Sequence, residues 1–594
     1  MYDPQGHRNR TVDPVIVAGA GPVGLTLALA LARLEVPVIL LDESTGGEES
    51  RLARTVVLRP DAAALLERLG CRVTARTRPW TGWRTMRRRQ LVRQVPLTPG
   101  SLFGGERGAG GLFGGQRGAG GWDGGLTEAM DSPGDDGPED EAAPAPTASP
   151  VHLPQHELTR ALRGSLAAIG DEDLVRIVSG SRIDSLEQDD HGVGVRTRGA
   201  QATWWRGSYL VGCDGPRSTV RKLLGVRFPG RTAVERHAVA ALRAELPWPG
   251  EAVLHRSPPW RSIDAEVTAR PLPHSLWRVD WLLPPGRDLV TPDALLVRVR
   301  DTLTGWCGDS EPPYELLDTG VHTVHHRLAL RWRVGRAFLA GDAAHLLGAL
   351  GTQGLEEGLR DVDNLAWKLS LAWHHGASEA LLDSYQAERR GAVGARLRAA
   401  DQALPLVRAA GGWHAVRRTV RPGGARGHDA LLTDGHLGQG PLGAPPVYDR
   451  SPLAPAAPPD GSITVGTAPG APVADVPVTA PDGSVVRLRE RLGRELLVVL
   501  VAPGTGVWDR RHWMRAGLMP RLAAAVAALP LRTELLVAEA YPGAPAHTVL
   551  LVRPDGHLAA ALSGVRPSAL YACADAARGG NAARGVPAEA SARQ

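Results

Sequence analysis

The chain has 594 residues, too many for one ordinary hydrophobic core, so two or three domains are expected. Hydrophobic residues make up 43% and charged residues 22%, which is typical of a soluble globular enzyme. The formal charge is +5, but lysine occurs only at Lys222 and Lys368 and the arginines are scattered among the acids. A nucleic-acid binder would concentrate its basic residues in a patch, so no nucleic-acid partner is expected.

The sequence predicts a cytoplasmic protein. No window approaches the ~18 consecutive apolar residues of a membrane-spanning helix, and the first residues lack the apolar core of a signal peptide. The four cysteines lie far apart and form no CxxC pair, which excludes a thiolate zinc site and a dithiol redox motif. They are predicted to be free structural cysteines: Cys71, Cys213, Cys307 and Cys573.

Residues 12–97 begin with a βαβ pattern, in which VIVAG (15–19) and VILLDES (38–44) flank the helical stretch 24–34. A glycine-rich turn follows the first strand and opens the helix, where backbone N–H groups and the helix dipole favour a pyrophosphate. Asp42, next to Glu43, ends the second strand, where a carboxylate accepts hydrogen bonds from a ribose. The glycine-rich turn and Asp42 together predict a bound dinucleotide, but they do not distinguish FAD from NAD. The residues of this turn, the dinucleotide fingerprint, are Gly19, Ala20, Gly21, Pro22, Val23 and Gly24.

Residues 98–150 interrupt this pattern. Two near-identical decamers, 102–111 and 112–121, precede an acidic Pro/Ala-rich stretch at 131–150. Glycine this dense does not repay its ordering entropy, so a disordered surface insertion is predicted, with a functional lid as the alternative.

Globular texture resumes at residue 151. Residues 151–229 begin with an amphipathic helix within 151–170 that a Pro-containing turn introduces, and 230–335 carry short alternating strands suited to a sheet that covers a ligand. Residues 336–420 contain a long helix with apolar residues at helical spacing, and 421–461 are Pro/Gly-rich and predict a linker. A separate α/β unit is predicted over 462–576, and a disordered tail at 577–594.

Two further segments carry a family resemblance. LVGCDGPRSTVRKLLG (210–225) resembles the Asp-Gly segment of the class A, para-hydroxybenzoate hydroxylase-like flavoprotein monooxygenases. GRAFLAGDAAH (335–345), with GTQGLEEGLRDVDNLAWKL (351–369) and LLDSYQAERR (381–390), resembles that family's Gly-Asp segment and the helical stretch C-terminal to it. The resemblance implies FAD as the cofactor, NADPH or NADH as a transient reductant, and an α/β fold. In that fold a Rossmann-like FAD-binding domain, formed by residues 12–97, 151–229 and 336–420, is interleaved with a mixed-sheet substrate domain at 230–335.

The resemblance also implies roles for individual residues. Asp342, beside Gly341, would bind an FAD ribitol hydroxyl. The turn that opens the long helix would face the flavin pyrimidine edge, where a helix N-terminus stabilises negative charge. This turn comprises Gly351, Thr352, Gln353 and Gly354.

Other side chains near the cofactor are implied in the same way. Arg54 is favoured over Arg51 as the arginine beside the flavin, and Gln155 matches a glutamine near the isoalloxazine. Asp214 and Gly215 correspond to the Asp-Gly pair that the family links to both FAD and NADPH. Arg217 and Arg221 would either meet the reductant's phosphates or pair within their own helix.

The chain departs from the family in the turn after GDAAH, which passes close to the reacting end of the flavin. Gly348 and Ala349 stand at the usual proline positions, and Thr352 replaces a glycine. No residue stands out as a catalytic acid or base. The histidines of TVHHRLALRWRVGR, together with His322, predict a sheet strand leading to the flavin segment rather than a metal site, and no metal is expected.

The C-terminal unit resembles the thioredoxin-like domain appended to many polyketide hydroxylases. Its expected active-site position reads TGVWDRRHW, without cysteine, so packing or a dimer contact is predicted for it, in a monomer or homodimer. The leading hypothesis is an NAD(P)H-dependent FAD monooxygenase that hydroxylates a bulky aromatic or polyketide-like compound in secondary metabolism. The alternative is an FAD-bound, non-redox cyclase of natural-product biosynthesis.

Overall fold

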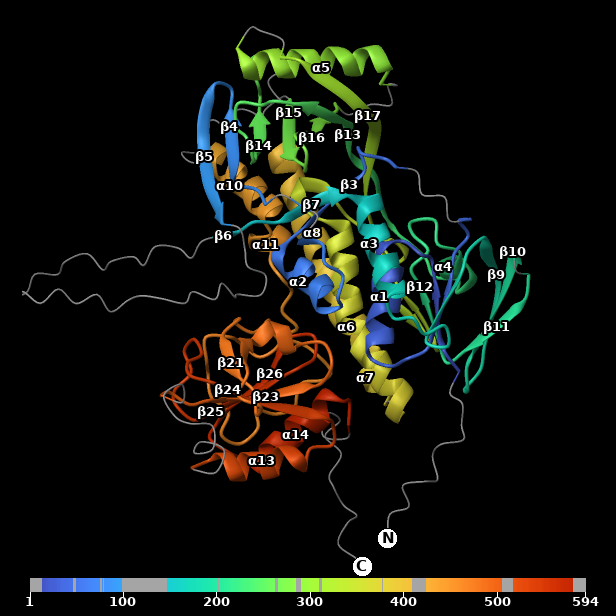
Figure 1. Cartoon of the computed structure of the whole chain (residues 1–594), viewed down its shortest axis with the longest axis vertical. Helices are drawn as coiled ribbons and strands as arrows, with labels where there is room; N and C mark the ends of the chain where they lie inside the picture. The colour runs from blue at the N-terminus through green and yellow to red at the C-terminus, as the bar shows by residue number, and fades with distance from the viewer. Residues whose placement is uncertain are drawn as a thin grey trace, which may run out of the picture.

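The computed structural model shows three α/β bodies packed around the long helix α6 (Figure 1). The 98–150 insertion lies outside the described residues except at its two ends. Among the described helices, none has the length and apolar character that a membrane span requires. The structure describes residues 13–45, 50–74, 77, 79–98, 147–200, 202–261, 265–284, 290–308, 312–376, 378–408, 424–504 and 517–580.

The first body is built on a six-stranded sheet with the order β18-β19-β12-β1-β2-β8. All neighbouring pairs are parallel except β18–β19. Helix α1 (Pro22–Arg33) connects β1 to β2, so the predicted βαβ unit is confirmed. The strands are β1 (Val15–Ala18), β2 (Val38–Leu41), β8 (Val175–Val178), β12 (Tyr209–Gly212), β18 (Arg333–Val334) and β19 (Ala337–Leu339).

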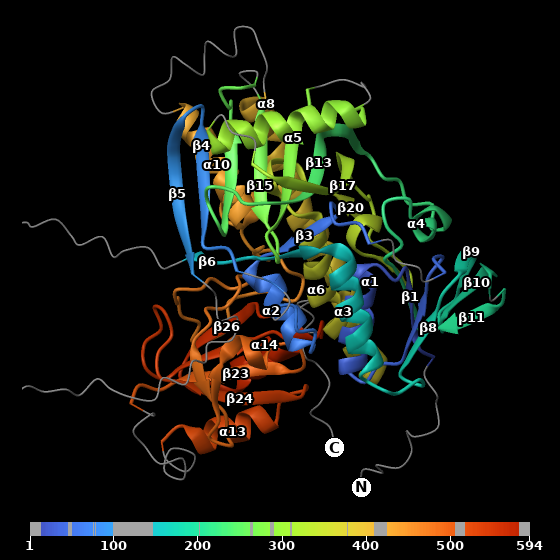
Figure 2. The ribbon, with the colours of Figure 1, turned by 45° about the horizontal axis from the view of Figure 1, so that its top comes forward.

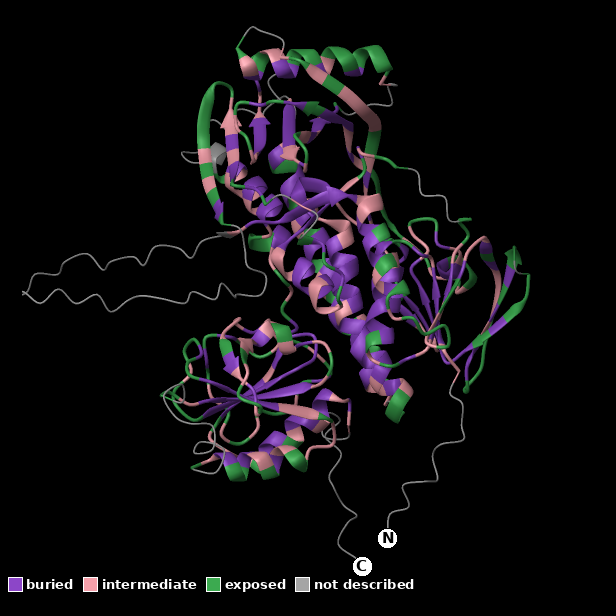
Figure 3. Ribbon diagram, viewed as in Figure 1, coloured by how far each residue is buried: buried purple, intermediate pink, exposed green. Residues whose placement is uncertain are grey.

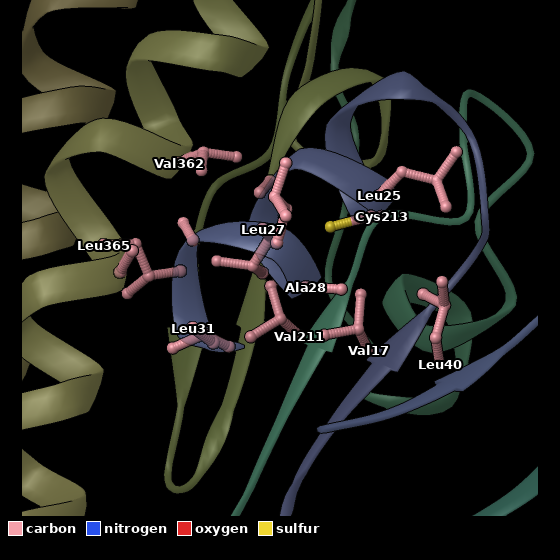
Figure 4. Packing of buried hydrophobic residues seen from close by; sticks show 14 of the residues in the cluster. Val17, Leu25, Leu27, Ala28, Leu31, Leu40, Val211, Cys213, Val362 and Leu365 are labelled. Atoms are coloured by element: carbon pink, nitrogen blue, oxygen red, sulfur yellow. The ribbon is translucent and has the colours of Figure 1, made fainter. Parts of the chain in front are cut away.

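Helix α1 is buried between this sheet and α6 (Gly354–His375), which explains why it is apolar on nearly every side (Figures 3 and 4). Leu27 and Leu31 lie toward Val362 and Leu365 of α6 in a common core. Burial of each such side chain stabilises the fold by roughly 1.5–3 kcal/mol. The same packing fixes the N-terminus of α1 and that of α6 relative to each other.

The second body is a nine-stranded sheet, β20-β17-β13-β16-β15-β14-β4-β5-β6. Helix α5 (Pro292–Cys307) covers one face, with Trp277, Trp281 and Leu303 in the shared core, and the other face lies toward the first body (Figure 2). The strands are β4 (Gly82–Arg87), β5 (Gln90–Thr98), β6 (Thr147–Ala148), β13 (Gly230–Ala244), β14 (Glu251–Arg256), β15 (Glu266–Pro271), β16 (Leu276–Leu282), β17 (Tyr314–Leu328) and β20 (His345–Leu346).

This sheet draws on more of the chain than 230–335. Strand β4 pairs in parallel with β14, which brings residues 82–98 and 147–148 into this second body instead of the first. The pairing joins strands about 170 positions apart in sequence, as the partners Gly82 and Glu251 show, and no local pattern reveals such a register.

Shorter elements surround these sheets. The helix predicted within 151–170 forms from Gln155 on, whereas the residues before it form strand β7, which pairs with β3. Residues 421–461, expected to be a linker, carry two helices from Gly424 on, because Leu432, Leu437 and Leu442 are buried in a common core. The elements are β3 (Thr55–Leu58), α2 (Pro60–Arg68), β7 (Val151–Pro154), α3 (Gln155–Ala167), β9 (Ser181–Gln188), β10 (Val193–Gly199), β11 (Trp204–Gly207), α4 (Thr219–Leu223), α7 (Glu379–Tyr385), α8 (Gly391–Arg408), α10 (Gly424–Leu437) and α11 (Gly440–Gly443).

The C-terminal body is a six-stranded mixed sheet, β22-β21-β24-β23-β25-β26, with two helices. The separate α/β unit is therefore present, and its likeness to thioredoxin stays a prediction because residues 505–516 lie outside the described residues. Its elements are β21 (Pro477–Thr479), β22 (Val485–Arg487), β23 (Leu496–Val501), β24 (Thr533–Ala538), β25 (Thr548–Val552), β26 (Leu558–Ser563), α13 (Met519–Ala527) and α14 (Pro567–Ala577).

Candidate cofactor and substrate site

The fingerprint forms an open cradle at the N-terminus of α1. Gly19 has φ +97°, and a Cβ there would lie 2.6 Å from the carbonyl oxygen of Cys213. A Cβ at Gly24 would lie 1.9 Å from the oxygen of Gly19, whereas one at Gly21 would meet no atom within 4 Å. The first and third glycines are thus required by packing, and the space over the middle one is free for a pyrophosphate.

The predicted ribose acid lies beside this cradle. The backbone N–H of Ala20 donates to Asp42 Oδ1 at 3.3 Å, which orients the carboxylate at the end of β2. Glu43 is exposed, 3.8 Å from Arg182, and lies farther out on the surface. The geometry supports Asp42 more strongly than Glu43 as a cofactor contact.

The Asp-Gly segment follows β12, the strand next to β1. Asp214 accepts hydrogen bonds from the backbone N–H groups of Thr219 (2.6 Å) and Val220 (3.0 Å), so its carboxylate holds the start of α4. Arg221 donates to the carbonyl of Ala343 at 2.8 Å and links this segment to the Gly-Asp segment. Of the two arginines weighed for the reductant, only Arg217 is exposed, since Arg221 is buried in this structural role.

The Gly-Asp segment packs directly on the fingerprint helix. Gly341 has φ +59°, and a Cβ there would lie 3.0 Å from Val23 Cγ2, while a Cβ at Gly358 of α6 would lie 2.6 Å from the same atom. Asp342 keeps an exposed side chain, although burial by the surrounding protein raises the pKa of its carboxyl against the opposing effects of His345 and Arg54. A side chain that is both accessible and enclosed lies in a concave part of the surface, as a ligand-binding carboxyl does.

The N-terminus of α6 opens beside Asp342. A Cβ at Gly354 would lie 3.9 Å from Asp342 Oδ1, and no side chain caps the helix, so its first N–H groups remain available to a ligand. Thr352 is buried, and its hydroxyl donates to the carbonyl of Ala349 at 2.8 Å, which stabilises the altered turn from within. Gln353 Nε2 donates to the carbonyl of Gly351 at 3.3 Å.

The two arginine candidates are separated by their contacts. Arg54 Nε donates to Gln155 Oε1 at 3.0 Å, and Arg54 is close enough to Asp342 to lower that carboxyl's pKa. Arg51 instead pairs with Asp318 of β17 at 3.1 Å. The structure therefore brings Arg54 and Gln155 together on the side of the site that Asp342 occupies.

A family model described as an FAD binding domain matches residues 13–400. The chain belongs to this family. The match spans all three segments, from the Gly19 cradle through Asp214 to Asp342, and the resemblance drawn from the sequence is confirmed together with its α/β fold and its FAD cofactor. The cradle at Gly21 and the accessible carboxyl of Asp342 suit the pyrophosphate and the ribitol of that cofactor.

A relative and two solved structures extend the comparison. The chain is 33% identical over 222 residues to the 3-(3-hydroxy-phenyl)propionate/3-hydroxycinnamic acid hydroxylase of Paraburkholderia xenovorans, which is 36% of this chain and 34% of that protein. It thus spans about a third of the length of that relative. The flavin-dependent monooxygenase PieE has a TM-score of 0.67 at 22% identity, over 95% of this chain and 98% of that one. The anhydrotetracycline hydroxylase OxyS of Streptomyces rimosus has a TM-score of 0.57 at 25% identity, over 94% and 96%.

Sequence reasoning missed two residues that hold the FAD-binding segments in place. Asp361 of α6 accepts hydrogen bonds from the backbone N–H of Gly341 (2.9 Å) and from Arg389 (2.9 Å), and it lies 2.8 Å from His345 Nε2. Arg59 donates to the carbonyl of Gly351 at 3.1 Å and to that of Gly435 in α10. A buried acid within an apolar helix stripe was the available signal for Asp361, and nothing in the sequence marked Arg59.

Polar side chains of β16 and β7 lie next to the segment that carries Arg54. Arg278 pairs with Asp280 at 2.7 Å and donates to Thr55 Oγ1 at 3.0 Å, next to Arg54 in sequence. His152 Nε2 lies 2.9 Å from the same hydroxyl. Among the described residues, no group of three or more His, Cys, Asp or Glu is arranged to hold a metal ion.

Proposed function

We propose that the protein is an FAD-dependent monooxygenase that uses NAD(P)H and O2 to hydroxylate a bulky aromatic or polyketide-like small molecule. The observation that carries the proposal is the meeting of the FAD cradle with a polar sheet face, through Asp342, Arg54 and Arg278. Hydroxylase activity in the 3-hydroxycinnamate relative and in OxyS supports it.

In this function the site residues would position the parts of the cofactor. The Gly21 cradle would hold the pyrophosphate, Asp42 the ribose and Asp342 the ribitol. The uncapped start of α6 would face the flavin edge, where its dipole would stabilise negative charge by roughly 0.3–1 kcal/mol. Arg54, held by Gln155, adds a positive charge on the same side. Bound FAD supplies the transfer of electrons from NAD(P)H and the activation of O2.

The reductant is expected to dock transiently, since the sequence holds no second complete dinucleotide fingerprint. Arg217, exposed two residues after Gly215, is available for its phosphates. A cytoplasmic location suits both a supply of NAD(P)H and the four free cysteines. For the C-terminal body we propose a packing role, possible without any redox cysteine.

Anaerobic reduction tests the proposal. The purified yellow protein is mixed with NADPH or NADH, with and without 2-naphthol or anhydrotetracycline, and flavin absorbance is followed. Substrate-stimulated bleaching, and incorporation of one oxygen atom into product after O2 is added, are the expected results. Flavin that stays oxidised with both reductants and both compounds contradicts the monooxygenase and favours the non-redox cyclase.

A further inference from the structure

Strand β17 presents one face to the FAD-binding body. Asp318 on this face pairs with Arg51 and accepts a hydrogen bond from the backbone N–H of Ala53 at 2.9 Å. Val324 follows six residues after Asp318, and a Cβ at Gly348 would lie 3.7 Å from Val324 Cγ1. Side chains alternate along a strand, so His322 belongs to the same face as Asp318 and Val324.

His322 differs from the next two histidines of the strand. His326 Nδ1 lies 2.8 Å from Asp401, and His325 accepts a hydrogen bond from the backbone N–H of Ala233 at 3.1 Å. No described residue forms a hydrogen bond with the ring of His322, and its side chain is exposed. Its two ring nitrogens are therefore available to a ligand.

The groups around His322 keep its ring neutral. His237 of β13 lies directly opposite in the sheet register and contacts Glu235, while Arg278 and Asp280 come from β16 and Arg54 from the segment before β3. Although the side chain stays accessible, desolvation by the surrounding protein lowers the pKa of His322 to about 4, with further lowering by Arg278, His237 and Arg54 against the opposing Asp280. A neutral imidazole has one nitrogen that accepts a hydrogen bond.

The strand also sets the distance of His322 from the turn that contains Gly348. Two residues along a strand span about 7 Å, so His322 and Val324 are neighbours on the same face. Because Val324 lies beside Gly348, His322 is also close to the turn that contains Gly348. That separation suits a substrate ring lying between the turn and the sheet, with one substituent directed at His322.

We propose that His322 recognises the substrate by accepting a hydrogen bond from a phenolic or enolic hydroxyl group. The hydroxyl donates its hydrogen to the unprotonated ring nitrogen. This bond increases the negative charge on the hydroxyl oxygen, and the positive charges of Arg278 and Arg54 stabilise that oxygen. His322 is then a catalytic residue that touches the substrate and selects hydroxylated rings. The inference rests on the proposed function, since it assigns a substrate class to that site.

Equilibrium dialysis of the oxidised FAD holoenzyme tests this inference without any turnover. The probes are 2-naphthol and 2-methoxynaphthalene, since only the naphthol has a hydroxyl hydrogen to donate. A site built to bond a hydroxyl rejects an analogue that lacks it. We expect the wild type to bind the naphthol at least ten-fold more tightly than the ether, and His322→Phe to bring the two within two-fold.

Two further variants sharpen the test. His322→Gln keeps an acceptor oxygen and should retain part of the preference, while His325→Phe, on the same strand but the other face, should retain all of it. FAD content and thermal unfolding check that each variant is folded. The inference is overturned if the wild type does not distinguish the probes, including the case in which neither binds, or if His322→Phe keeps the preference. If the wild type shows the binding preference but does not hydroxylate, the result contradicts the proposed function alone.

Discussion

Arg553 and Glu388 form a fully buried ion pair between the C-terminal body and the FAD-binding body, with Nη1–Oε1 at 2.6 Å and Nη2–Oε2 at 2.9 Å. Burial alone would raise the pKa of Glu388, but Arg553 and Lys368 hold it well below its ordinary value. Lys368 of α6 donates to the same carboxylate at 2.7 Å. The C-terminal body is thus anchored on α6, the helix whose first turn is predicted to face the flavin.

Loss of this anchor should destabilise the whole protein. Arg553→Met leaves Glu388 and Asp555 buried without their shared cation, and breaking such a pair costs about 3–5 kcal/mol. We expect urea unfolding of the holoprotein to shift by that amount and FAD to be released earlier in the transition. Arg566→Met removes an exposed pair with Asp460 and serves as the control, with a change under about 1 kcal/mol. Equal effects of the two variants would show that the buried pair has no special role.

The fingerprint glycines should separate cofactor binding from folding. A Cβ at Gly21 meets no protein atom and its φ of −73° suits alanine, so Gly21→Ala should fold normally and bind FAD at least ten-fold more weakly. Gly24→Ala forces a contact of 1.9 Å with the backbone of Gly19 and should lower the melting temperature of the apoprotein. Flavin fluorescence titration and thermal unfolding of the apoproteins measure the two effects. Wild-type FAD affinity in Gly21→Ala would place the pyrophosphate elsewhere.

Removal of the Asp342 carboxyl should release the flavin. Asp342→Ala is expected to purify with less than a tenth of the wild-type FAD, because the ribitol loses its acceptor while no hydrogen bond to another described residue is broken. The absorbance ratio of flavin to protein measures retention, with Asp460→Ala at the surface as the control. A fully flavinated Asp342→Ala protein would refute the assignment of this residue.

Features encoded in short sequence stretches could be predicted. The turn from Gly19 to Gly24 and the strand–turn–helix around Asp342 depend on local conformation, and the structure forms both. The prediction of β17 through the histidine-containing segment is confirmed for the same reason.

Contacts between distant segments could not be predicted. Arg59 reaches Gly435 across 376 positions, and α10 packs on the turn at Gly351 and buries Leu432 and Leu437 in a core shared with distant segments. Its glycine-rich sequence favours a loop when it is considered alone. The partner of Glu388 is likewise set by how two bodies dock.

Two buried histidines should make the protein sensitive to mild acid. Burial lowers the pKa of both His152 and His436 to about 3, whereas an unfolded histidine titrates near 6.5. The unfolded state therefore binds more protons below pH 6.5, so the stability that the neutral rings provide is complete above that pH and is lost as the pH falls toward 3. Each histidine contributes up to about 1.4 kcal/mol per pH unit within this window.

His436→Phe isolates one of these contributions. His436 stacks on Trp83 with ring centroids 4.9 Å apart, and phenylalanine keeps an aromatic ring there without a titrating group. The free energy of unfolding should fall between pH 6.5 and 5 by about 2 kcal/mol more in the wild type than in the variant. Urea titrations of both holoproteins at the two pH values measure this difference, in which carboxyl groups common to both proteins cancel. Parallel pH profiles would mean that His436 is not held neutral, and α10 would then have to sit more loosely over Trp83 than the stacking distance indicates.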